Sequence, residues 1–179
     1  MTEAEAHDDN HGDNHGNNVT ELRIRQAHPG EAEELTRLAT ASKAHWNYTK
    51  EQLALWRGEL SVPADVIFNG RAYVGEIDHT LVAMMVLAPA KITWKLSHFF
   101  VSPDRLNQGI GKKMFNYAIE IAQKQGARAF AIDADPNAEP FYLACGAIRS
   151  HAIAAPIADD ANRIRPQMLF TIQAKKSYG

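Results

Sequence analysis

The sequence lacks the features that would place it in a membrane, in an oxidising compartment or on nucleic acid. Its only cysteine is Cys145, so no internal disulfide can form. No apolar run approaches the roughly 20 residues that a membrane-spanning helix needs, and the N-terminus shows no signal-peptide pattern. The formal net charge of −2 provides no broad basic surface for nucleic acid. We therefore expect a cytoplasmic protein without membrane or nucleic-acid partners.

The first 18 residues differ in composition from the rest of the chain. Residues 1–18 hold five acidic residues, no lysine or arginine and almost no apolar residues, so we expect a disordered tail. Three histidines recur there at every fourth position: His7, His11 and His15. On a helix they could bind a metal loosely, but two glycines in the same stretch disfavour a helix, and we expect no specific metal. Residues 19–179 carry 19 basic against 16 acidic residues, a net charge of +3, and have the length of one domain.

One stretch, residues 96–146, organises this domain. An apolar and aromatic strand over 96–101 is followed by a helix that starts at Gly109-Ile110-Gly111 and ends at Gly126. The apolar residues between those glycines recur with the 3.6-residue period of a helix. A second strand over 127–134 and a short helix over 136–145 complete the stretch.

The two glycines at the start of this helix suit an anion. They remove side chains where a ligand would approach the backbone. The N–H groups of the first helical turn have no partner inside the helix and, together with the helix dipole, favour a phosphate or pyrophosphate. Lys112 adds positive charge nearby. A lone Gly-x-Gly is a weak signal, however, and by itself also fits an ordinary tight turn.

The spacing of three short motifs resembles that of the GNAT superfamily of acyl-CoA-dependent N-acetyltransferases. The motifs are Val101-x-Pro103, Gly109-x-Gly111 and Ala138-x-x-Phe141-Tyr142-x-x-x-Gly146. The resemblance implies an α/β (α+β) domain over 19–179. Its central sheet would be mixed and mostly antiparallel, with about seven strands, splayed at the cofactor site and covered by helices on both faces.

The resemblance also implies acetyl-CoA as co-substrate and assigns residues to it. The expected cofactor-binding residues are Phe99, Phe100, Val101, Gln108, Gly109, Ile110, Gly111, Lys112, Asn137 and Tyr142. Tyr142 is also the expected catalytic acid, which would protonate the CoA thiolate. The sequence departs from the family pattern at Leu106, where Gln or Arg is usual, and Arg105 stands beside it. Binding of phosphate through backbone amides is insensitive to such changes.

The acceptor side is less constrained by the sequence. In the family, the loop between the first two helices overhangs this side, and the candidate substrate residues are His45, Trp46, Ser97 and Asp135. Trp46 and Tyr48 could equally pack the helices onto the sheet. Asp159 and Asp160 could attract a cationic acceptor or belong to a solvated loop over 156–166. The family also uses this loop in dimer contacts, so a homodimer is an open expectation.

The general base is left open by the sequence. Side chains alternate along a strand, which places Ser97 on the face where a base is first expected, and a serine is not a strong base. Alternation sends His98 to the other face as a core histidine, unless a bulge intervenes. The carboxylates Glu76, Asp133 and Asp135 could relay a proton through water.

The remaining pattern predicts the other elements of the domain. Strands are expected over 20–26, 71–77, 81–87, 92–101, 149–155 and 167–172, and a helix over 31–44. Thr49 and Gln52 form a capping box for a second helix. The predicted function is transfer of an acetyl group from acetyl-CoA to a primary amine of a small molecule or peptide, by direct attack in a ternary complex. The alternatives are an acyltransferase acting on a protein N-terminus and a non-catalytic acyl-CoA-binding regulatory module.

Overall fold

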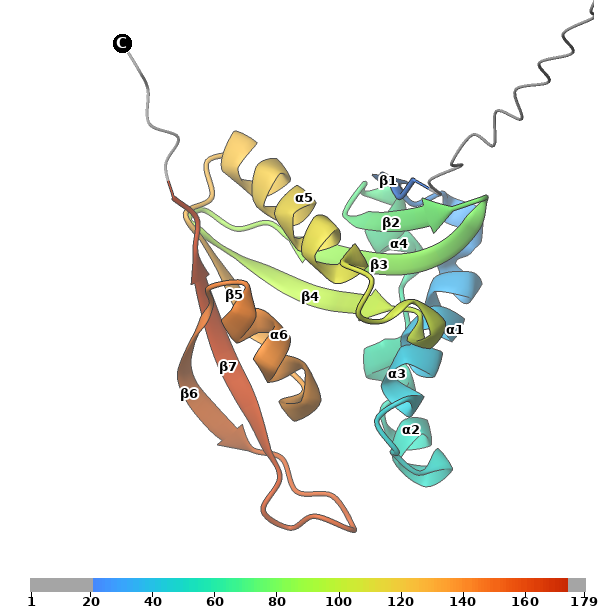
Figure 1. Cartoon of the computed structure of the whole chain (residues 1–179), viewed down its shortest axis with the longest axis vertical. Helices are drawn as coiled ribbons and strands as arrows, with labels where there is room; N and C mark the ends of the chain where they lie inside the picture. The colour runs from blue at the N-terminus through green and yellow to red at the C-terminus, as the bar shows by residue number, and fades with distance from the viewer. Residues whose placement is uncertain (1–20, 174–179) are drawn as a thin grey trace, which may run out of the picture.

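The computed structural model describes residues 21–173 and builds them around one seven-stranded sheet (Figure 1). The strands are β1 (Arg23–Gln26), β2 (Ala72–Ile77), β3 (Thr80–Ala88), β4 (Thr93–Val101), β5 (Ala129–Asp133), β6 (Ile148–Ala154) and β7 (Ile164–Thr171). Their order across the sheet is β1-β2-β3-β4-β5-β7-β6. Every neighbouring pair is antiparallel except β4 and β5, which are parallel. The predicted mixed and mostly antiparallel sheet is confirmed.

Helices cover both faces of the sheet, as the sequence predicts. The α-helices are α1 (Ala32–Ala44), α2 (Lys50–Leu55), α3 (Arg57–Leu60), α4 (Ala64–Phe68), α5 (Ile110–Lys124) and α6 (Glu139–Ala144). The short 3-10 helices are η1 (Pro29–Glu31), η2 (Pro103–Arg105) and η3 (Pro136–Ala138). Figure 1 shows α5 crossing one face, with α6 beside β5 and β7. The N-terminal helices cover the other face. Thr49 and Gln52 form the predicted capping box at the start of α2.

The sheet separates two apolar cores. The larger core holds the buried face of α5, including Met114 and Phe115, against Leu96 of β4 and Phe130 of β5. The second core packs Leu35 and other residues of α1, α3 and α4 against the opposite face. All residues of β2 and most of β3 are buried, as expected of central strands covered on both faces. This burial makes β3 a rigid support for β4.

Two local predictions are wrong. The loop expected over 156–166 ends earlier, because β7 begins at Ile164 and includes Pro166. Proline normally breaks a strand because it lacks an N–H. Here the Pro166 carbonyl accepts a hydrogen bond from Ala134 N at 2.9 Å, beyond the last β5–β7 pair, where no ladder donor is needed. The pattern also predicts no helix where α4 lies, directly after Pro63 as its N-cap residue.

Residues 1–20 and 174–179 lie outside the described part of the chain. The predictions for the tail over 1–18, its disorder and its histidines, therefore stay predictions. Among the helices of residues 21–173, none has both the length and the apolarity to cross a bilayer.

Candidate functional site

The site begins where β4 and β5 part. The two parallel strands pair only from Thr93 with Ala129 to Leu96 with Ile132. Beyond Leu96, β4 continues beside β3 as far as Val101, while β5 continues beside β7. Figure 1 shows β4 and β7 diverging from a shared corner. The second half of β4 therefore has an unpaired edge, which is the splay that the resemblance implies.

A β-bulge at Ser97 lies at the point of parting. The pairing of β4 with β3 runs from Val86 with His98 to Leu87 with Leu96, so Ser97 is the extra residue. A bulge bends a strand and reverses the alternation of side chains beyond it. Phe99 consequently joins Leu96 on the α5 face. The uninterrupted alternation expected for β4 is wrong beyond Ser97, for this reason.

The bulge leaves two backbone donors directed into the gap. Ser102 N donates to Val82 O of β3 at 2.8 Å. Because successive N–H groups of a strand point to opposite sides, those of Val101 and Phe99 point away from β3. They face the side from which β5 has departed. A ligand in the gap can therefore pair with β4 as a missing strand would.

A groove of about 1260 Å³ occupies the gap between the two parts of the sheet, which are β1 to β4 on one side and β5, β7 and β6 on the other. The predicted cofactor residues that line it are Phe99, Phe100, Val101, Gly109, Gly111, Lys112, Asn137 and Tyr142. The predicted substrate residues that line it are His45, Trp46, Ser97 and Asp135. Gln108 and Ile110 are not among the lining residues. The Gln108 amide instead donates to Asp104 O at 3.1 Å, and the Ile110 side chain is buried in the core.

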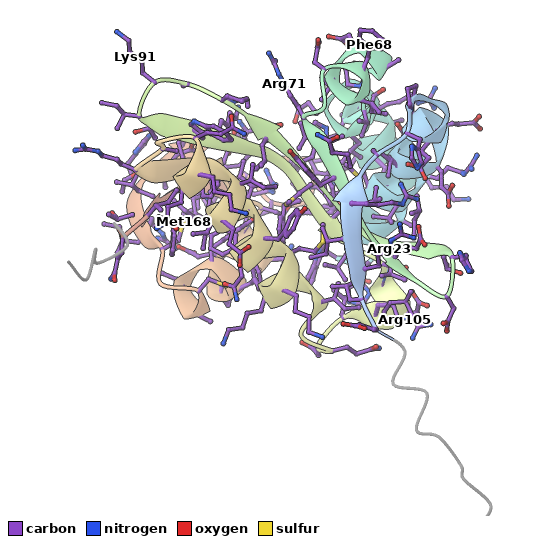
Figure 2. All side chains as sticks on the ribbon, turned by 90° about the horizontal axis from the view of Figure 1, so that it is seen from above. Arg23, Phe68, Arg71, Lys91, Arg105 and Met168 are labelled. Carbon is purple, nitrogen blue, oxygen red and sulfur yellow. The ribbon has the colours of Figure 1, made fainter. Side chains whose placement is uncertain are left out.

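The two glycines at the start of α5 have different physical roles. Gly109 adopts φ +78°, a left-handed conformation that glycine tolerates best, and open space lies where its Cβ would be. A Cβ on Gly111 would lie only 3.1 Å from Cε2 of Phe141. Glycine at this position therefore allows α6 to approach α5 closely. Arg105, the last residue of η2 (Figure 2), precedes the turn that starts α5 and lines the groove. The corner thus presents backbone amides beside Arg105 and Lys112.

Tyr142 lies on α6 beneath the groove. Its ring is centred 6.2 Å from that of Phe99 and 6.1 Å from that of Phe115, in an aromatic cluster of the larger core. The residue is only 5% exposed. Burial raises the pKa of its phenol well above the ordinary value, so the hydroxyl keeps its proton at neutral pH. No residue of the described chain holds this hydroxyl by a side-chain hydrogen bond. It is therefore available as a donor.

His98 faces the other side of the gap because of the bulge. Its Nε2 lies 3.2 Å from Ser61 O, which follows α3, and its ring contacts Phe100. A carbonyl oxygen only accepts, so this contact places the proton on Nε2 and leaves the lone pair on Nδ1. Nδ1 lies 3.4 Å from the Ser97 hydroxyl. Burial lowers the pKa of His98, which keeps the ring neutral at pH 7.

The three candidate relay carboxylates differ in their ion-pair partners and in their position relative to the groove. Glu76 forms an ion pair with Arg25 at 2.8 Å and is not among the residues that line the groove. Asp133 lines the groove and pairs with Arg165 at 2.8 Å. Asp135 also lines it. Within residues 21–173, no three side chains of histidine, cysteine, aspartate or glutamate gather as metal ligands.

Asp135 anchors a largely buried ionic cluster in the wall of the groove. Its Oδ2 pairs with Lys43 Nζ of α1, accepts from Tyr48 Oη at 2.9 Å and lies 3.4 Å from Arg163 NH2. The Lys43 ammonium lies 4.7 Å from the ring centroid of Trp56 and 4.9 Å from that of Tyr48. The cluster therefore joins helices α1 and α2 to the part of the sheet formed by β5 and β7.

Three members of this cluster were missed in the sequence: Lys43, Trp56 and Arg163. Lys43 adjoins the predicted acceptor loop, so its position offered a local signal. Arg163 lies in the stretch interpreted as a solvated loop, yet its side chain is only 6% exposed. Nothing in a single sequence indicates that a loop arginine 28 positions from Asp135 will contact it. Tyr48 packs its ring against Trp56 and donates its hydroxyl to Asp135, and it is not among the residues that line the groove.

Replacing Asp135 by asparagine should strongly destabilise the fold at neutral pH. Two largely buried cations would lose their shared carboxylate, a change that costs about 3–5 kcal/mol of unfolding free energy. Lys43 and the other contacts lower the pKa of Asp135 despite burial, so its stabilisation is present above its unfolded pKa and is lost as pH falls through the lower folded value. Urea unfolding at pH 7 and pH 3 measures both effects.

The control for this measurement is Glu33→Gln, which removes an exposed helical ion pair with Arg37. Such pairs contribute little, so its unfolding free energy should change by less than about 0.5 kcal/mol. An Asp135→Asn variant as stable as this control at pH 7 would contradict the structural role of the cluster.

The fold and the groove define a class of protein: an N-acyltransferase fold in which one parallel strand pair opens above a glycine corner. The chain belongs to the acetyltransferase (GNAT) family, whose model matches residues 32–147. No curated protein sequence matches the chain significantly.

Solved structures share this fold at low sequence identity. A GCN5-related N-acetyltransferase from Rhodopseudomonas palustris is 19% identical, with a TM-score of 0.65 over 84% of this chain and 95% of that one. Ard1 from Thermoplasma volcanium is 15% identical, with a TM-score of 0.64 over 85% and 98% of the two chains. The PaiA N-acetyltransferase from Thermoplasma acidophilum, solved in complex with coenzyme A, is 17% identical, with a TM-score of 0.62 over 84% and 99%. These likenesses confirm the fold.

Proposed function

We propose that this protein transfers an acetyl group from acetyl-CoA to a primary amine of a small molecule or peptide, within a ternary complex. The observation that carries the proposal is the parting of β4 from β5 beyond Leu96, beside a helix that starts at two glycines. Membership of the GNAT family and the coenzyme A complex of the PaiA structure support it.

The residues of the groove fit a CoA thioester, which supplies an activated acetyl group. The N–H groups at the start of α5, from Gly109 to Lys112, suit a pyrophosphate because they have no partner inside the helix. The N–H groups of Phe99 and Val101 face the gap and can pair with an amide-bearing chain. Val101 N–H can also donate to the carbonyl oxygen as negative charge develops on it.

His98 is the base that the geometry favours. An alkylammonium has an unperturbed pKa of ~10.4, so presenting a neutral amine at pH 7 costs roughly 4.6 kcal/mol. His98 is neutral, lines the groove and carries its lone pair on Nδ1, which lies 3.4 Å from Ser97 Oγ. It can accept the proton directly or through one water molecule. Glu76 is not among the residues that line the groove, and Asp133 and Asp135 are held in ion pairs.

Tyr142 is the acid of the proposal. Its hydroxyl stays protonated because burial raises its pKa, and it lies on the α5 and α6 face of the gap. His98 borders the gap from the face covered by α1 and α3. The proton acceptor and the proton donor therefore approach the reacting atoms from opposite sides. Such a division lets one group act on the amine while the other acts on the departing thiolate.

The proposal is tested with acetyl-CoA and a broad panel of primary amines. Calorimetry measures binding of acetyl-CoA, and a thiol reagent measures release of CoA during turnover. We expect binding together with amine-dependent release. Tight binding of acetyl-CoA without release of CoA for any amine would contradict the proposed enzymatic activity. It would favour a non-catalytic acyl-CoA-binding module.

Lys112 should contribute to cofactor affinity, whereas its neighbour Lys113 should not. Lys112 lines the groove, and Lys113 is not among the lining residues. Lys112→Gln should weaken acetyl-CoA binding by about tenfold, because a charge-assisted contact contributes about 1.5 kcal/mol or more. The dissociation constants of Lys112→Gln and of the matched control Lys113→Gln are compared at low salt. Equal constants would show that the pyrophosphate does not bind at this corner.

A further inference from the structure

The acceptor end of the groove is rich in charged side chains of both signs. Its cations are Lys43, Lys95, Arg163 and Arg165, and its carboxylates are Glu59, Asp133 and Asp135. They come from helices α1 and α3, from β4, and from β5 and β7 with the residues beside them. The way in which these charges pair restricts the kind of amine that the groove can accept.

Each carboxylate among these lining residues already has a cationic partner. Asp135 pairs with Lys43 and Arg163. Asp133 pairs with Arg165 and also accepts from Gln167 Nε2 at 2.7 Å. Arg165 further lies 3.7 Å from Glu59. A polycationic acceptor, such as a polyamine or an aminoglycoside, would add charges that these carboxylates cannot neutralise without giving up their partners.

The acidic loop does not supply the missing negative charge. Asp159 and Asp160, which were considered as an attraction for a cationic acceptor, are not among the residues that line the groove. Asp159 instead accepts a hydrogen bond from Gln52 Nε2 of α2 at 3.3 Å. The loop thus contacts α2 rather than presenting carboxylates to a substrate.

The cluster around Asp135 carries a surplus of buried positive charge. Lys43 and Arg163 are 15% and 6% exposed, and they share one carboxylate. Arg163 NH1 donates to Ala155 O at 3.1 Å, but Nε of Arg163 finds no hydrogen-bond partner among the described residues. Trp56 and Tyr48 flank both cations. An unbalanced cation in such surroundings is costly, and an added anion would relieve that cost.

We infer that the acceptor is a small amine that also carries a carboxylate, an amino acid or similar zwitterion, and that Arg163 and Lys43 bind its carboxylate. The inference rests on the proposed function and specifies its substrate class. Arginine suits the role because its planar fork pairs with both oxygens of a carboxylate. The carboxylate would neutralise the cluster, while the amine of the same molecule extends along the groove toward His98.

The test compares acceptors that differ only in the carboxylate. Turnover is measured by CoA release for the standard amino acids, each beside its carboxamide, with spermidine as a polycation. For the accepted amino acid, kcat/KM should exceed that of its amide by roughly 10- to 100-fold, as expected for loss of a charge-assisted pair. Amides or spermidine used as well as the acids would overturn the inference.

Two variants localise the effect. Arg163→Gln should raise KM for the amino acid and remove most of its preference over the amide, with little change for the amide. Arg149→Gln is the control, because Arg149 pairs with Glu139 on the outside of the sheet and is not a lining residue. An unchanged preference in a folded Arg163→Gln variant would contradict the role of Arg163. Should that variant fail to fold, the acid-to-amide comparison in the unaltered protein still decides.

Binding of reaction products distinguishes this inference from the proposed function. Calorimetry of N-acetylamino acids and their amides, in the presence of CoA, requires no turnover. Preference for the acids supports the carboxylate site, and equal binding of acids and amides or binding of neither overturns it. Failure of acetyl-CoA itself to bind would instead contradict the proposed acetyltransferase.

Discussion

Tyr142→Phe should lower kcat by about 10²- to 10⁴-fold while leaving acetyl-CoA affinity almost unchanged. This range is typical of removing a general acid. The substitution removes one oxygen and keeps the ring that packs against Phe99 and Phe115, so the fold should lose little stability. Stopped-flow measurement of CoA release gives the chemical step, and calorimetry gives the affinity.

Tyr117→Phe is the matched control for this prediction. Tyr117 is on the same side of the sheet, where its ring contacts that of Tyr73, and it is not among the residues that line the groove. Its kcat should equal that of the unaltered protein. A Tyr142→Phe variant with the same kcat as this control would show that the phenol does not protonate the leaving group.

His98→Gln should lower kcat/KM at pH 7 by about 10²- to 10⁴-fold, because the bound ammonium would lose its proton acceptor. Glutamine keeps a donor for the carbonyl of Ser61, so the packing around α3 should survive. Turnover of the best acceptor gives the ratio. His151→Gln on the outer strand β6 is the control, since His151 is exposed and away from the lining residues.

The pH profile separates a base from a structural histidine. His98 acts when neutral, and burial lowers its pKa, so kcat/KM should be level near pH 7 and fall only below the ordinary histidine range, near pH 6.5. In His98→Gln the break between the acid limb and the level region should vanish, and the residual activity should instead rise steadily with pH as free amine becomes available. A variant that retains this break would exclude His98 as the titrating group.

Most of the fold was predictable from the sequence because local signals agree with the tertiary structure. The amphipathic pattern of α5, its glycine boundaries and the capping box of α2 each correspond to an element found in the structure. The strand expected over 81–87 is found as β3, and all seven of these residues are buried. Pro166 misled the prediction, because its compatibility with β7 depends on where the neighbouring β5 ends.

The candidate site was less predictable because its geometry depends on one extra residue and on distant contacts. The sequence placed the glycine corner and Tyr142 through their motif spacing. It could not place His98, because alternation assigns that side chain to a face until the bulge at Ser97 reverses it. The pairing of Lys43 with Asp135 joins residues 92 positions apart, which meet because α1 and the chain after β5 border the same groove.

The most direct test of this account is a crystal structure of the protein grown with acetyl-CoA. The account predicts electron density for the pyrophosphate at the amides of Gly109 to Lys112. The thioester arm should lie between β4 beyond Leu96 and β5 beyond Ile132, with its sulfur near the Tyr142 hydroxyl. Density for the cofactor elsewhere on the molecule, or β4 and β5 paired along their whole length with the groove closed, would contradict it.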